Sequence, residues 1–256
     1  MISEVITKQS QQKSIRLSVV SHNQDDLVEQ VLSSLARSCQ TNRLLVTVTQ
    51  NTLTSTIKRF SHFPFPVEII QNAEPKGFGA NHNQAFRTCR EDYFCVLNPD
   101  IILCDDPFDP LVSSLSSPNI GVVAPAIVDF DDVLQDSARR FLTPVRVVAR
   151  ALFRGKQDFE FPTDTPLHPD WVAGMFMLFP ASVFRETGGF DEQFFMYCED
   201  ADICKRLLNK GYRTMLLPQV QIIHDAQRAS HNSFHHLRYH ISSLLRFFIR
   251  YPFYTL

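Results

Sequence analysis

Short runs of β-forming residues alternate with helical stretches along most of the chain, beginning with the run Ile15–Ser21. The segment that follows, 25–37, places Leu27, Val31 and Leu35 on one helical face. Parallel strands are joined by crossover connections that usually contain a helix, so the alternation predicts an α/β domain with a parallel sheet. Further strands are expected at 43–49, 67–71, 93–97, 213–217 and 220–224, an apolar run spans 172–179, and helices are expected at 144–153 and 199–209.

The length and charge of the chain limit what it can be. With 256 residues it can bury a large core, and it is most simply one domain with appendages. We expect a polar tail at 1–14, a main domain at 15–230 and a C-terminal amphipathic helical segment at 231–256. A net charge of −2 and a pI near 6.5 argue against a protein held on nucleic acid by phosphate contacts. A small partner is expected instead.

The sequence has no visible signal for export or for crossing a membrane. The N-terminus lacks a charged segment followed by an apolar stretch, and the longest strongly apolar run, 171–179, is too short to span a bilayer. The six cysteines have no C-x-x-C spacing and are easiest to explain as reduced thiols. We therefore expect a cytoplasmic protein, either free or peripheral on the inner face of the cytoplasmic membrane.

Polar residues follow the expected strands. In an open parallel sheet, ligands bind beyond the carboxyl ends of the strands, so these residues predict a binding edge. Turn-forming residues also end strands that bind nothing, and this second interpretation stays open here. The residues are Ser21, His22 and Asn23 after the first strand, Gln50 and Asn51 after the second, Asn72 after the third, and Asn98, Pro99 and Asp100 after the fourth.

Three carboxylates, Glu199, Asp200 and Asp202, lie within four positions, directly behind an aromatic run. Mutual repulsion and burial raise the pKa of a carboxyl group, which is one way to make a general base. Acidic residues are also common in the first turn of a helix, and Asp202 could pair with Arg206 one turn on. The segment therefore contains a catalytic base, or a helix start, or both.

Three other places could bind a ligand. Asp100 could hold a hard divalent cation through oxygen, although Asn-Pro-Asp is also an ordinary turn. His224 ends an expected strand and could be a further metal ligand, although a lone histidine is more often structural. The segment 77–85 is a loop with Gly77 and Gly79 that opens a helix, where the backbone can approach an anion, but it can equally be a plain turn with a helix cap. It satisfies neither the dinucleotide fingerprint nor the phosphate-loop motif.

In chain order, these segments resemble an inverting glycosyltransferase of family 2 with the GT-A fold, over about residues 15 to 250. The matching segments are the opening strand with 21–23, the loop 77–83, Leu-Asn-Pro-Asp at 97–100, the run 171–178, the run 188–202 and His224. Within the family, segments 170–174 and 195–200 most resemble bacterial rhamnosyltransferases of lipopolysaccharide O-antigen assembly. The resemblance implies a mixed, mostly parallel central sheet flanked by helices.

The resemblance also implies residue roles. Asp100 would belong to a degenerate Asp-x-Asp motif whose first position is here Asn98. The catalytic residues would be Asp200 and, as second choice, Glu199; the ligands of Mg²⁺ or Mn²⁺ would be Asp100 and His224; the donor-binding residues would be Ser21, Asn23, Gln50, Asn51, Gly77, Phe78, Gly79, Asn83, Asn98 and Asp100; and the acceptor side would include Trp171, Gly174, Asp191 and Tyr197. Gln50-Asn51 replaces the family's usual Asp-Asn pair, which leaves the nucleotide preference open.

The implied reaction moves L-rhamnose from dTDP-L-rhamnose to a hydroxyl of a lipid-linked oligosaccharide acceptor, with inversion at the anomeric carbon. One alternative is a family 2 transferase that uses a UDP-hexose or N-acetylhexosamine donor. Another is a non-catalytic nucleotide-sugar-binding subunit, which the replacement of acids by Gln50 and Asn98 would suit. A nucleotidyltransferase would need a Gly-rich, basic phosphate loop near the N-terminus, and the chain lacks one.

The C-terminal segment 235–254 has the periodicity of an amphipathic helix. Such a helix either packs its apolar face on the catalytic domain or lies on a membrane surface near a lipid-linked acceptor. The apolar stripe consists of Leu237, Ile241, Leu244, Leu245 and Phe248, with Arg238, Arg246 and Arg250 around it.

Overall fold

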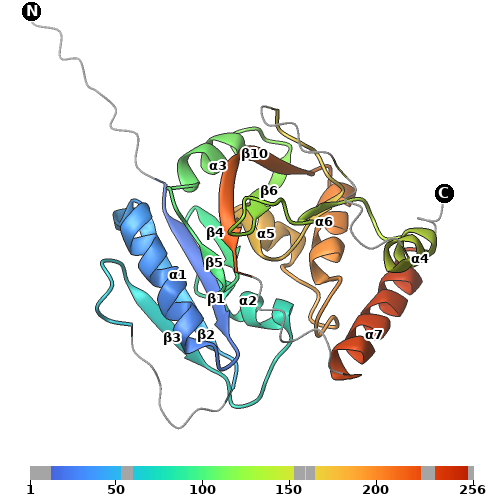
Figure 1. The fold of residues 1–256 in the computed structure, drawn as a ribbon, viewed down its shortest axis with the longest axis horizontal. Coiled ribbons are helices and arrows are strands. Elements are labelled where there is room, and N and C mark those ends of the chain that lie inside the picture. The colour runs from blue at the N-terminus through green and yellow to red at the C-terminus, as the bar shows by residue number, and fades with distance from the viewer. Residues whose placement is uncertain (1–12, 53–59, 153–158, 160–164, 226–233, 253–256) are drawn as a thin grey trace, which may run out of the picture.

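The computed structural model describes residues 13–52, 60–152, 159, 165–225 and 234–252 (Figure 1). Most of the expected tail, the end of the helix expected at 144–153 and the expected domain boundary at 230 lie outside these residues. Lys13 and Ser14, the last two residues of that tail, both donate hydrogen bonds to the Asp92 carboxylate. The expected division into tail, domain and C-terminal segment therefore stays a prediction.

Eight strands form one central sheet in the order β3-β2-β1-β4-β9-β6-β10-β5. Strand β9 is antiparallel to β4 and β6, β5 is antiparallel to β10, and the other neighbours are parallel. This mixed, mostly parallel sheet confirms the expected fold class. The strands are β1 (Ile15–Ser21), β2 (Leu44–Gln50), β3 (Val67–Gln71), β4 (Tyr93–Leu97), β5 (Ile101–Ile102), β6 (Ile120–Val128), β9 (Phe176–Pro180) and β10 (Arg213–His224), and a separate antiparallel pair joins β7 (Ala138–Arg139) to β8 (Trp171–Val172).

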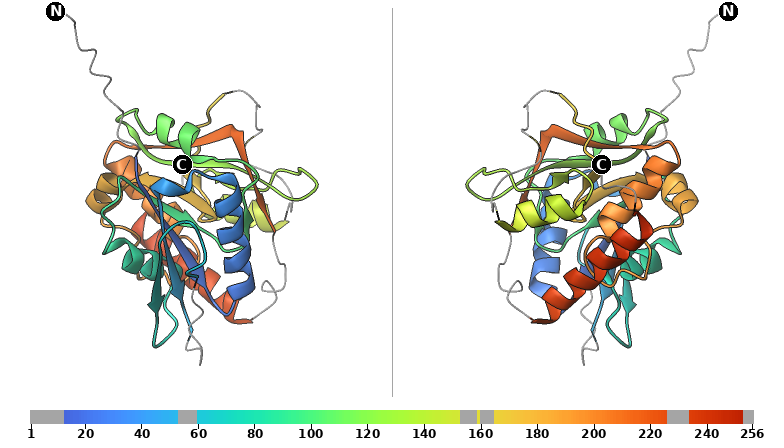
Figure 2. Two further views of the ribbon diagram at one scale, coloured as in Figure 1. Left: turned by 90° about the vertical axis from the view of Figure 1, so that its left-hand side faces the viewer. Right: turned by 90° about the vertical axis from the view of Figure 1, so that its right-hand side faces the viewer.

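Side chains of the central strands alternate between two apolar clusters, one on each face of the sheet. In β9, Phe176 and Leu178 belong to the first cluster, and Met177 and Phe179 to the second. Both clusters are buried because helices cover both faces (Figures 1 and 2). The first receives side chains from α1 (Asp25–Ser38) and α3 (Phe108–Ser114), and the second from α2 (Phe78–Phe86), α5 (Ala181–Thr187), α6 (Glu199–Asn209) and α7 (Phe234–Arg250).

One expected boundary was wrong. The runs 213–217 and 220–224 form one strand, β10, because its ladder to β6 shifts register between Leu217 and Gln221 without ending. The apolar run 172–179 is divided between β8 and β9, since Gly174 lies in a turn between them. The turn places the backbone of residue 174 next to helix α6, as described below.

Strand β6 is not expected from the sequence, whose pattern loosens from about 125. The strand continues to Val128, and all nine of its residues are buried. A strand buried on both faces lacks the polar and apolar alternation of a half-exposed strand, so periodicity gives no signal for it. Helix α4 (Pro144–Leu152) then follows where a helix was expected.

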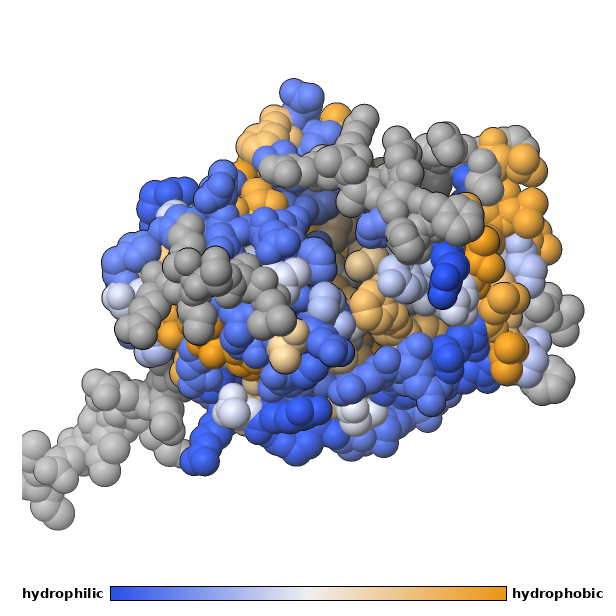
Figure 3. Space-filling view, turned by 90° about the horizontal axis from the view of Figure 1, so that it is seen from below, coloured by the Kyte–Doolittle hydropathy of each residue, from blue (hydrophilic) through white to orange (hydrophobic). Residues whose placement is uncertain are grey.

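The parallel strands end at one edge of the sheet, and their polar end residues share that edge. Strands β1, β2, β3 and β4 end at Ser21, Gln50, Gln71 and Leu97. Strand β10 runs in the same direction as β4, because two antiparallel pairings separate β4 from β6, and it ends at His224. Figure 3 looks onto this edge from below and shows a hollow near its centre.

The C-terminal helix α7 packs one face on the domain and exposes another. Phe247 is buried in the second cluster, and the buried Ser243 donates a hydrogen bond to the carbonyl oxygen of Met196 at 2.8 Å. Ile241 and Ile249 are instead 50% and 79% exposed. Neither α7 nor another helix in the described part of the chain combines the length and apolarity needed to cross a bilayer.

Candidate active site

The acidic run opens helix α6 directly after a strained turn. Tyr197 and Cys198 have φ angles of 71° and 67°, in the left-handed region that non-glycine residues seldom adopt. Each such residue costs about 1–3 kcal/mol and persists where surrounding contacts hold it. One of these contacts joins the Tyr197 hydroxyl to Nδ1 of His236 on α7 at 3.0 Å. The helix start predicted at Glu199 is confirmed.

Asp200 is held in place by two backbone N–H groups. Its Oδ2 accepts a hydrogen bond from Gly174 N at 3.1 Å, and its Oδ1 accepts one from Ala201 N at 2.8 Å. Burial raises the pKa of Asp200, and these N–H groups and the positive charge of Arg139 offset only part of the effect. Each oxygen keeps a lone pair, so the carboxylate can accept a proton from a bound hydroxyl group.

Glu199 lies deeper than Asp200, with 5% of its surface exposed. Its Oε2 has no hydrogen-bond partner within the described residues. Burial, followed by the charge of Asp200, raises the pKa of Glu199 well above its ordinary value. Two carboxyl groups this close titrate as a pair. We expect Glu199 to hold the proton and Asp200 to be ionised, because a buried, unpaired carboxylate is the costlier species.

The raised pKa of Glu199 predicts a pH dependence of stability. Since the folded protein binds this proton more tightly than the unfolded chain, the free energy of unfolding should fall as pH rises from the ordinary glutamate pKa towards the raised one. Glu199→Gln removes the titrating group, so urea titrations between about pH 5 and about pH 8 should show a shallower fall than in the unsubstituted protein. An equally steep fall in the variant would mean that Glu199 is ionised in the folded protein.

Asp202 has a structural role. It is fully buried, and Arg206 Nε donates to its Oδ2 at 2.7 Å, which confirms the predicted pairing. Arg250, the last residue of α7, and Tyr251, which follows it, also contact Asp202: Tyr251 donates to Oδ1 at 2.8 Å, and Arg250 Nη1 lies 3.3 Å from the same oxygen. Asp202 therefore joins helix α6 to the C-terminal helix.

Asp202→Ala is expected to lower the free energy of unfolding by about 3–5 kcal/mol, because the Arg206 guanidinium and the Tyr251 hydroxyl lose their buried acceptor. Urea denaturation measures the change. Asp105→Ala is the control: this aspartate is exposed, and its loss should change stability by no more than about 0.5 kcal/mol. Equal stabilities for the two variants would exclude the structural role of Asp202.

The structure brings Asp100 and His224 together. His224 Nε2 lies 3.2 Å from Asp100 Oδ2. Strand pairing produces this contact, because His224 is opposite Ile101 in the β5–β10 ladder, and Asp225 N donates to the Asp100 carbonyl at 2.9 Å. Two residues far apart in sequence therefore meet at the sheet edge.

Gln135 fixes the orientation of the His224 ring. Its Nε2 donates to the carbonyl oxygen of His224 at 3.0 Å, so its Oε1 faces Nδ1 of the ring at 2.7 Å. Oε1 of Gln135 accepts a proton carried by Nδ1, which leaves Nε2 as the ring atom that faces Asp100. Asp100 Oδ1 is itself buried without a partner in the described part of the chain. A cation at this point would satisfy these acceptors.

The donor set suits a particular kind of cation. Within the described residues, no group of three or more His, Cys, Asp or Glu side chains could hold a metal ion. One carboxylate and one imidazole suit Mg²⁺ or Mn²⁺ when phosphate oxygens and water supply the other ligands. The residues present therefore fit a divalent cation that binds together with a diphosphate.

The glycine loop packs against the residues before the acidic run. Phe78 N donates to the carbonyl oxygen of Phe195 at 2.9 Å, and a Cβ atom at Gly77 would lie 2.5 Å from that oxygen. A Cβ atom at Gly174 would lie 2.9 Å from the Phe78 ring and 3.9 Å from Asp200 Oδ2. A side chain at position 77 would therefore clash with Phe195, and one at position 174 would clash with Phe78.

One backbone segment connects the acidic run to the aspartate and histidine pair. Gly174 N donates to Asp200, and the next residue, Met175, accepts a hydrogen bond from Asn98 N at 2.9 Å. Asn98 is two positions before Asp100. The candidate base and the candidate metal ligands are therefore linked through the backbone of residues 174 and 175.

The other expected donor-binding residues lie along the same edge, but several are occupied by the protein. Ser21 donates to Asp25 at 2.9 Å, and Asn23, with φ of 59°, accepts a hydrogen bond from Thr52. Both amide atoms of Asn51 bond the backbone of Lys76. These side chains shape the edge, whereas their contact with a donor stays a prediction.

Gln50 is the exception among these residues. It is 2% exposed, and both its amide nitrogen and its amide oxygen lack a hydrogen-bond partner in the described part of the chain. A buried primary amide with no partner costs free energy, so a ligand that pairs with it would recover that cost. This geometry supports its predicted contact with the donor.

Asn83 and Gly79 serve the packing of α2 against the loop at 188–190. The side-chain nitrogen of Asn83 donates to the carbonyl oxygen of Phe190 at 2.8 Å, and its side-chain oxygen accepts from Phe190 N at 2.9 Å. A Cβ atom at Gly79 would lie 2.6 Å from the Phe190 side chain. Neither residue has a group free in this arrangement to reach a donor directly. Asn83 and Gly79 would therefore influence donor binding through the position of the loop at 188–190.

The residues expected on the acceptor side make contacts within the protein. Trp171 is 4% exposed, and its Nε1 donates to the carbonyl oxygen of Arg140 at 2.9 Å. Asp191 pairs with Arg250 of α7. Tyr197 is more accessible, but its hydroxyl bonds His236. Direct contact of these residues with an acceptor stays a prediction, as does the role of Gly174.

Two residues near the site, Gln135 and Arg139, were not predicted from the sequence. Gln135 orients His224 from a segment with no regular pattern, so nothing in the sequence marks it. Arg139 lies with its guanidinium 5.0 Å from the centre of the Trp171 ring, and its charge opposes the rise in the pKa of Asp200. The adjacent pair Arg139-Arg140 was the sequence signal that could have indicated a positively charged side chain near the site.

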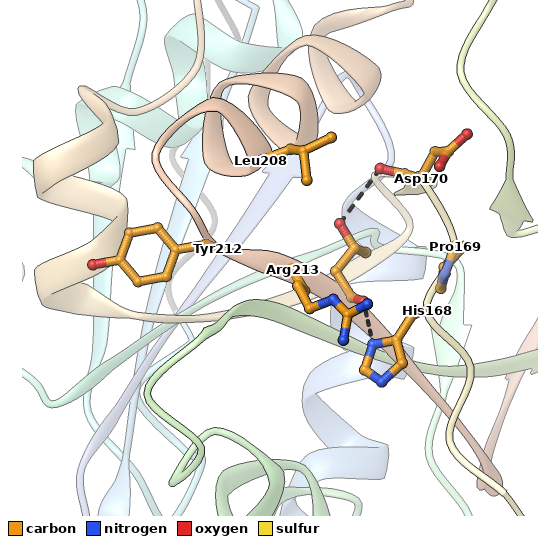
Figure 4. Close-up of a pocket in the computed structure, with 7 residues that line it drawn as sticks. His168, Pro169, Asp170, Leu208, Tyr212 and Arg213 are labelled. Atoms are coloured by element: carbon orange, nitrogen blue, oxygen red, sulfur yellow. Dashed lines mark hydrogen bonds between the residues drawn. The ribbon is translucent and has the colours of Figure 1, made fainter.

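A small cavity of about 150 Å³ lies at the start of β10, opposite the end that bears His224. Figure 4 shows His168 and Asp170 beside it, with His168 Nδ1 3.1 Å from the carbonyl oxygen of Thr214. Tyr212 and Arg213 line its other side. None of the predicted site residues lines this cavity.

Comparison with known families identifies the chain. The family described as "Glycosyltransferase like family 2" matches residues 12–238. The chain belongs to this family. The match covers the central sheet, both candidate groups of site residues and the start of α7, and it confirms the resemblance noted in the sequence.

Two curated relatives of this family 2 glycosyltransferase are rhamnosyltransferases. Rhamnosyltransferase WbbL of Escherichia coli K12 is 28% identical over 246 residues, which cover 91% of this chain and 91% of that protein. N-acetylglucosaminyl-diphospho-decaprenol L-rhamnosyltransferase of Mycobacterium tuberculosis H37Rv is 29% identical over 164 residues. That match covers 57% of this chain and 53% of the mycobacterial protein, so it spans about half of the relative.

Solved structures share the fold at low sequence identity. GalNAc-T7 with UDP, GalNAc and Mn²⁺ superposes with a TM-score of 0.65 and 14% identity, covering 84% of this chain and 44% of that chain. The mannosyltransferase PcManGT from Pyrobaculum calidifontis, in complex with GDP-Man and Mn²⁺, gives 0.63 and 16%, covering 94% and 65%. These likenesses confirm the GT-A fold of this family 2 glycosyltransferase.

Proposed function

We propose that the chain is an inverting, cation-dependent rhamnosyltransferase of the cytoplasm. It would move L-rhamnose from dTDP-L-rhamnose to a hydroxyl group of a lipid-linked glycan, in the synthesis of O-antigen or another cell-surface polysaccharide. The observation that supports this most is the backbone link from Asp200 through Gly174 and Met175 to Asn98, which joins a carboxylate of raised pKa to the Asp100 and His224 pair.

The choice of sugar and acceptor rests on the relatives. The name of the E. coli relative gives rhamnosyl transfer, and that of the mycobacterial relative gives rhamnosyl transfer to a diphospho-decaprenol-linked sugar. The two share fewer than a third of their aligned residues with this chain. Membership of family 2 supports sugar transfer, whereas the donor and the acceptor are inferred from these relatives.

Asp200 is the proposed base. It takes the proton of the acceptor hydroxyl as that oxygen attacks the anomeric carbon, and the bond from this carbon to the diphosphate oxygen breaks with its electron pair on the diphosphate. The N–H groups of Gly174 and Ala201 hold the carboxylate in one orientation during the transfer. Attack from the face opposite the diphosphate converts a β-L-rhamnosyl donor into an α-L-rhamnoside.

Asp100 and His224 are the proposed ligands of Mg²⁺ or Mn²⁺, with Gln135 keeping Nε2 of His224 available. When bound, such a cation neutralises negative charge on the leaving diphosphate. Gln50 would contact the nucleobase, because its unpaired amide can both donate to and accept from the imide edge of thymine or uracil. Glutamine brings no charge, so it does not by itself select between these two bases.

A panel of nucleotide sugars tested for protection against thermal unfolding, with and without Mn²⁺, tests this function. A ligand that binds the folded chain raises its apparent stability. We expect dTDP-L-rhamnose to raise the melting temperature most, and more with the cation than without it. Stronger protection by a UDP-sugar would reassign the donor, and no protection by any nucleotide sugar would favour a non-catalytic role.

A further inference from the structure

Helices α4 and α7 expose apolar side chains on one side of the molecule. In α7, the exposed residues recur every fourth position and so form one stripe. Figure 2 (right) faces the side on which both helices lie, and Figure 3 shows hydrophobic residues gathered along its right-hand edge. The exposed residues are Leu237 (57%), Ile241 (50%), Leu245 (58%) and Ile249 (79%) in α7, and Val145 (78%), Val148 (57%) and Leu152 (72%) in α4; we call these seven the apolar face.

The segments that contain the two helices concentrate the positive charge of the chain. Six basic and no acidic residues lie between 137 and 157, and four basic and no acidic residues lie between 226 and 256. Because the whole chain has a net charge of −2, the remainder carries an excess of twelve negative charges. The sequence is therefore polarised along the chain. In the structure, Arg139 and Arg150 pair with Asp136 and Arg250 pairs with Asp191, so the charge that these segments offer to a partner is smaller than the count of basic residues.

Exposed apolar residues beside basic ones match the chemistry of an anionic lipid surface. Apolar side chains gain free energy by entering the boundary of the acyl chains, and each arginine near anionic headgroups adds attraction. A partner protein would need a surface that is both acidic and apolar, whereas an anionic bilayer offers both properties over its whole surface. Charge complementarity therefore favours a membrane as the occupant.

Helix α7 also contacts the loop that leads to the candidate base. Ser243 bonds Met196, the Tyr239 ring stacks on Phe195 with centroids 4.7 Å apart, and Arg250 pairs with Asp191. A surface bound through α7 would therefore lie next to the loop before Asp200. This position would suit an acceptor whose lipid part stays in the bilayer.

We propose that the apolar face of α4 and α7 docks the protein on an anionic bilayer surface. The inference goes beyond sugar transfer, since it concerns a surface separate from the catalytic residues. It can be tested without substrate, so its failure would leave the proposed function untouched.

Flotation with vesicles of phosphatidylglycerol and phosphatidylcholine tests the proposal, with vesicles of phosphatidylcholine alone for comparison. We expect the full chain to float with the anionic vesicles and to bind the neutral ones more weakly. Raising the salt concentration to about 0.5 M should weaken the binding, because surface charges are then screened. Absence of flotation with anionic vesicles at low salt, or equal binding to both vesicles, would overturn the proposal.

Substitutions locate the surface. The double variants Leu245→Ser with Ile249→Ser, and Val145→Ser with Val148→Ser, should each lower vesicle binding by about tenfold or more, since each removes two apolar side chains from the interface. Arg238→Glu should weaken binding to anionic vesicles but not to neutral ones. Leu208→Ser is the matched control, because Leu208 is a 43% exposed leucine on α6 that lies outside the face.

Two further measurements make the result decisive. Hydrogen exchange on vesicles should protect 144–152 and 234–250, which requires no substitution and so does not depend on the variants folding. Sedimentation in the absence of lipid should show the same mass for the unsubstituted chain and the serine variants. A dimer that the serine substitutions dissociate, in a chain that does not float, would assign the face to self-association and overturn the membrane proposal.

Discussion

Asp200→Asn is expected to lower the turnover number for sugar transfer by about two or more orders of magnitude, the usual contribution of a general base. The substitution keeps the size of the side chain but removes the group that accepts the proton. The side-chain oxygen of asparagine can still accept one of the two backbone hydrogen bonds, so the fold should persist. Turnover numbers under saturating donor and acceptor, with thermal melting as a check of folding, measure the effect.

The control for this prediction is Asp105→Asn, which changes an exposed aspartate in the same way. Its turnover should stay within about twofold of the unsubstituted protein, since surface changes away from the site seldom matter. Donor affinity should also be similar in all three proteins, because Asp200 faces the acceptor in this account. Near-normal turnover in Asp200→Asn would remove this residue from the role and direct attention to Glu199.

His224→Ala is expected to abolish the dependence of nucleotide binding on Mn²⁺, because it removes one of the two protein ligands proposed for the cation. Titration of Mn²⁺ by electron paramagnetic resonance in the presence of dTDP measures this. Gln135→Ala should weaken Mn²⁺ affinity by about 10–100-fold, since it removes only the hydrogen bond that orients the His224 ring. A high cation concentration should therefore restore transfer in Gln135→Ala but not in His224→Ala.

His168→Ala is the matched control, because His168 lies beside the cavity of Figure 4 at the opposite end of β10. It should bind Mn²⁺ and dTDP as the unsubstituted protein does. If His224→Ala binds the cation with dTDP as tightly as this control, His224 is not a ligand. Equal affinities for Gln135→Ala and the control would show that ring orientation contributes nothing.

Much of the fold could be predicted from the sequence because local residue type and hydrophobic periodicity determine many of its elements. Strands Ile15–Ser21 and Tyr93–Leu97 and helix Glu199–Asn209 lie where residue type and periodicity placed them. Strand β6 was missed because burial on both faces removes the alternation that marks a strand. Gly174 is a local signal for a break in the apolar run, but its packing against Phe78 and Asp200 is visible only in the folded protein.

The candidate site was predictable where a residue type implies its own chemistry, as for Asp100, Asp200 and His224. It was not predictable where the partner is distant in sequence. Gln135 and His224 are 89 positions apart, and Asp202 and Tyr251 are 49 apart. The unpaired amide of Gln50 is likewise a property of the folded protein, because only the structure shows that no described neighbour satisfies it.

The most direct test is to incubate the purified protein with dTDP-β-L-rhamnose, Mn²⁺ and an N-acetylglucosaminyl-diphospho-lipid acceptor, and to determine the anomeric configuration of the product by nuclear magnetic resonance. Retention or inversion at the anomeric carbon is visible in the one-bond carbon–hydrogen coupling. We expect an α-L-rhamnoside that forms with the cation and not in excess chelator. A β-L-rhamnoside, or transfer that is unaffected by chelation, would contradict the proposed mechanism.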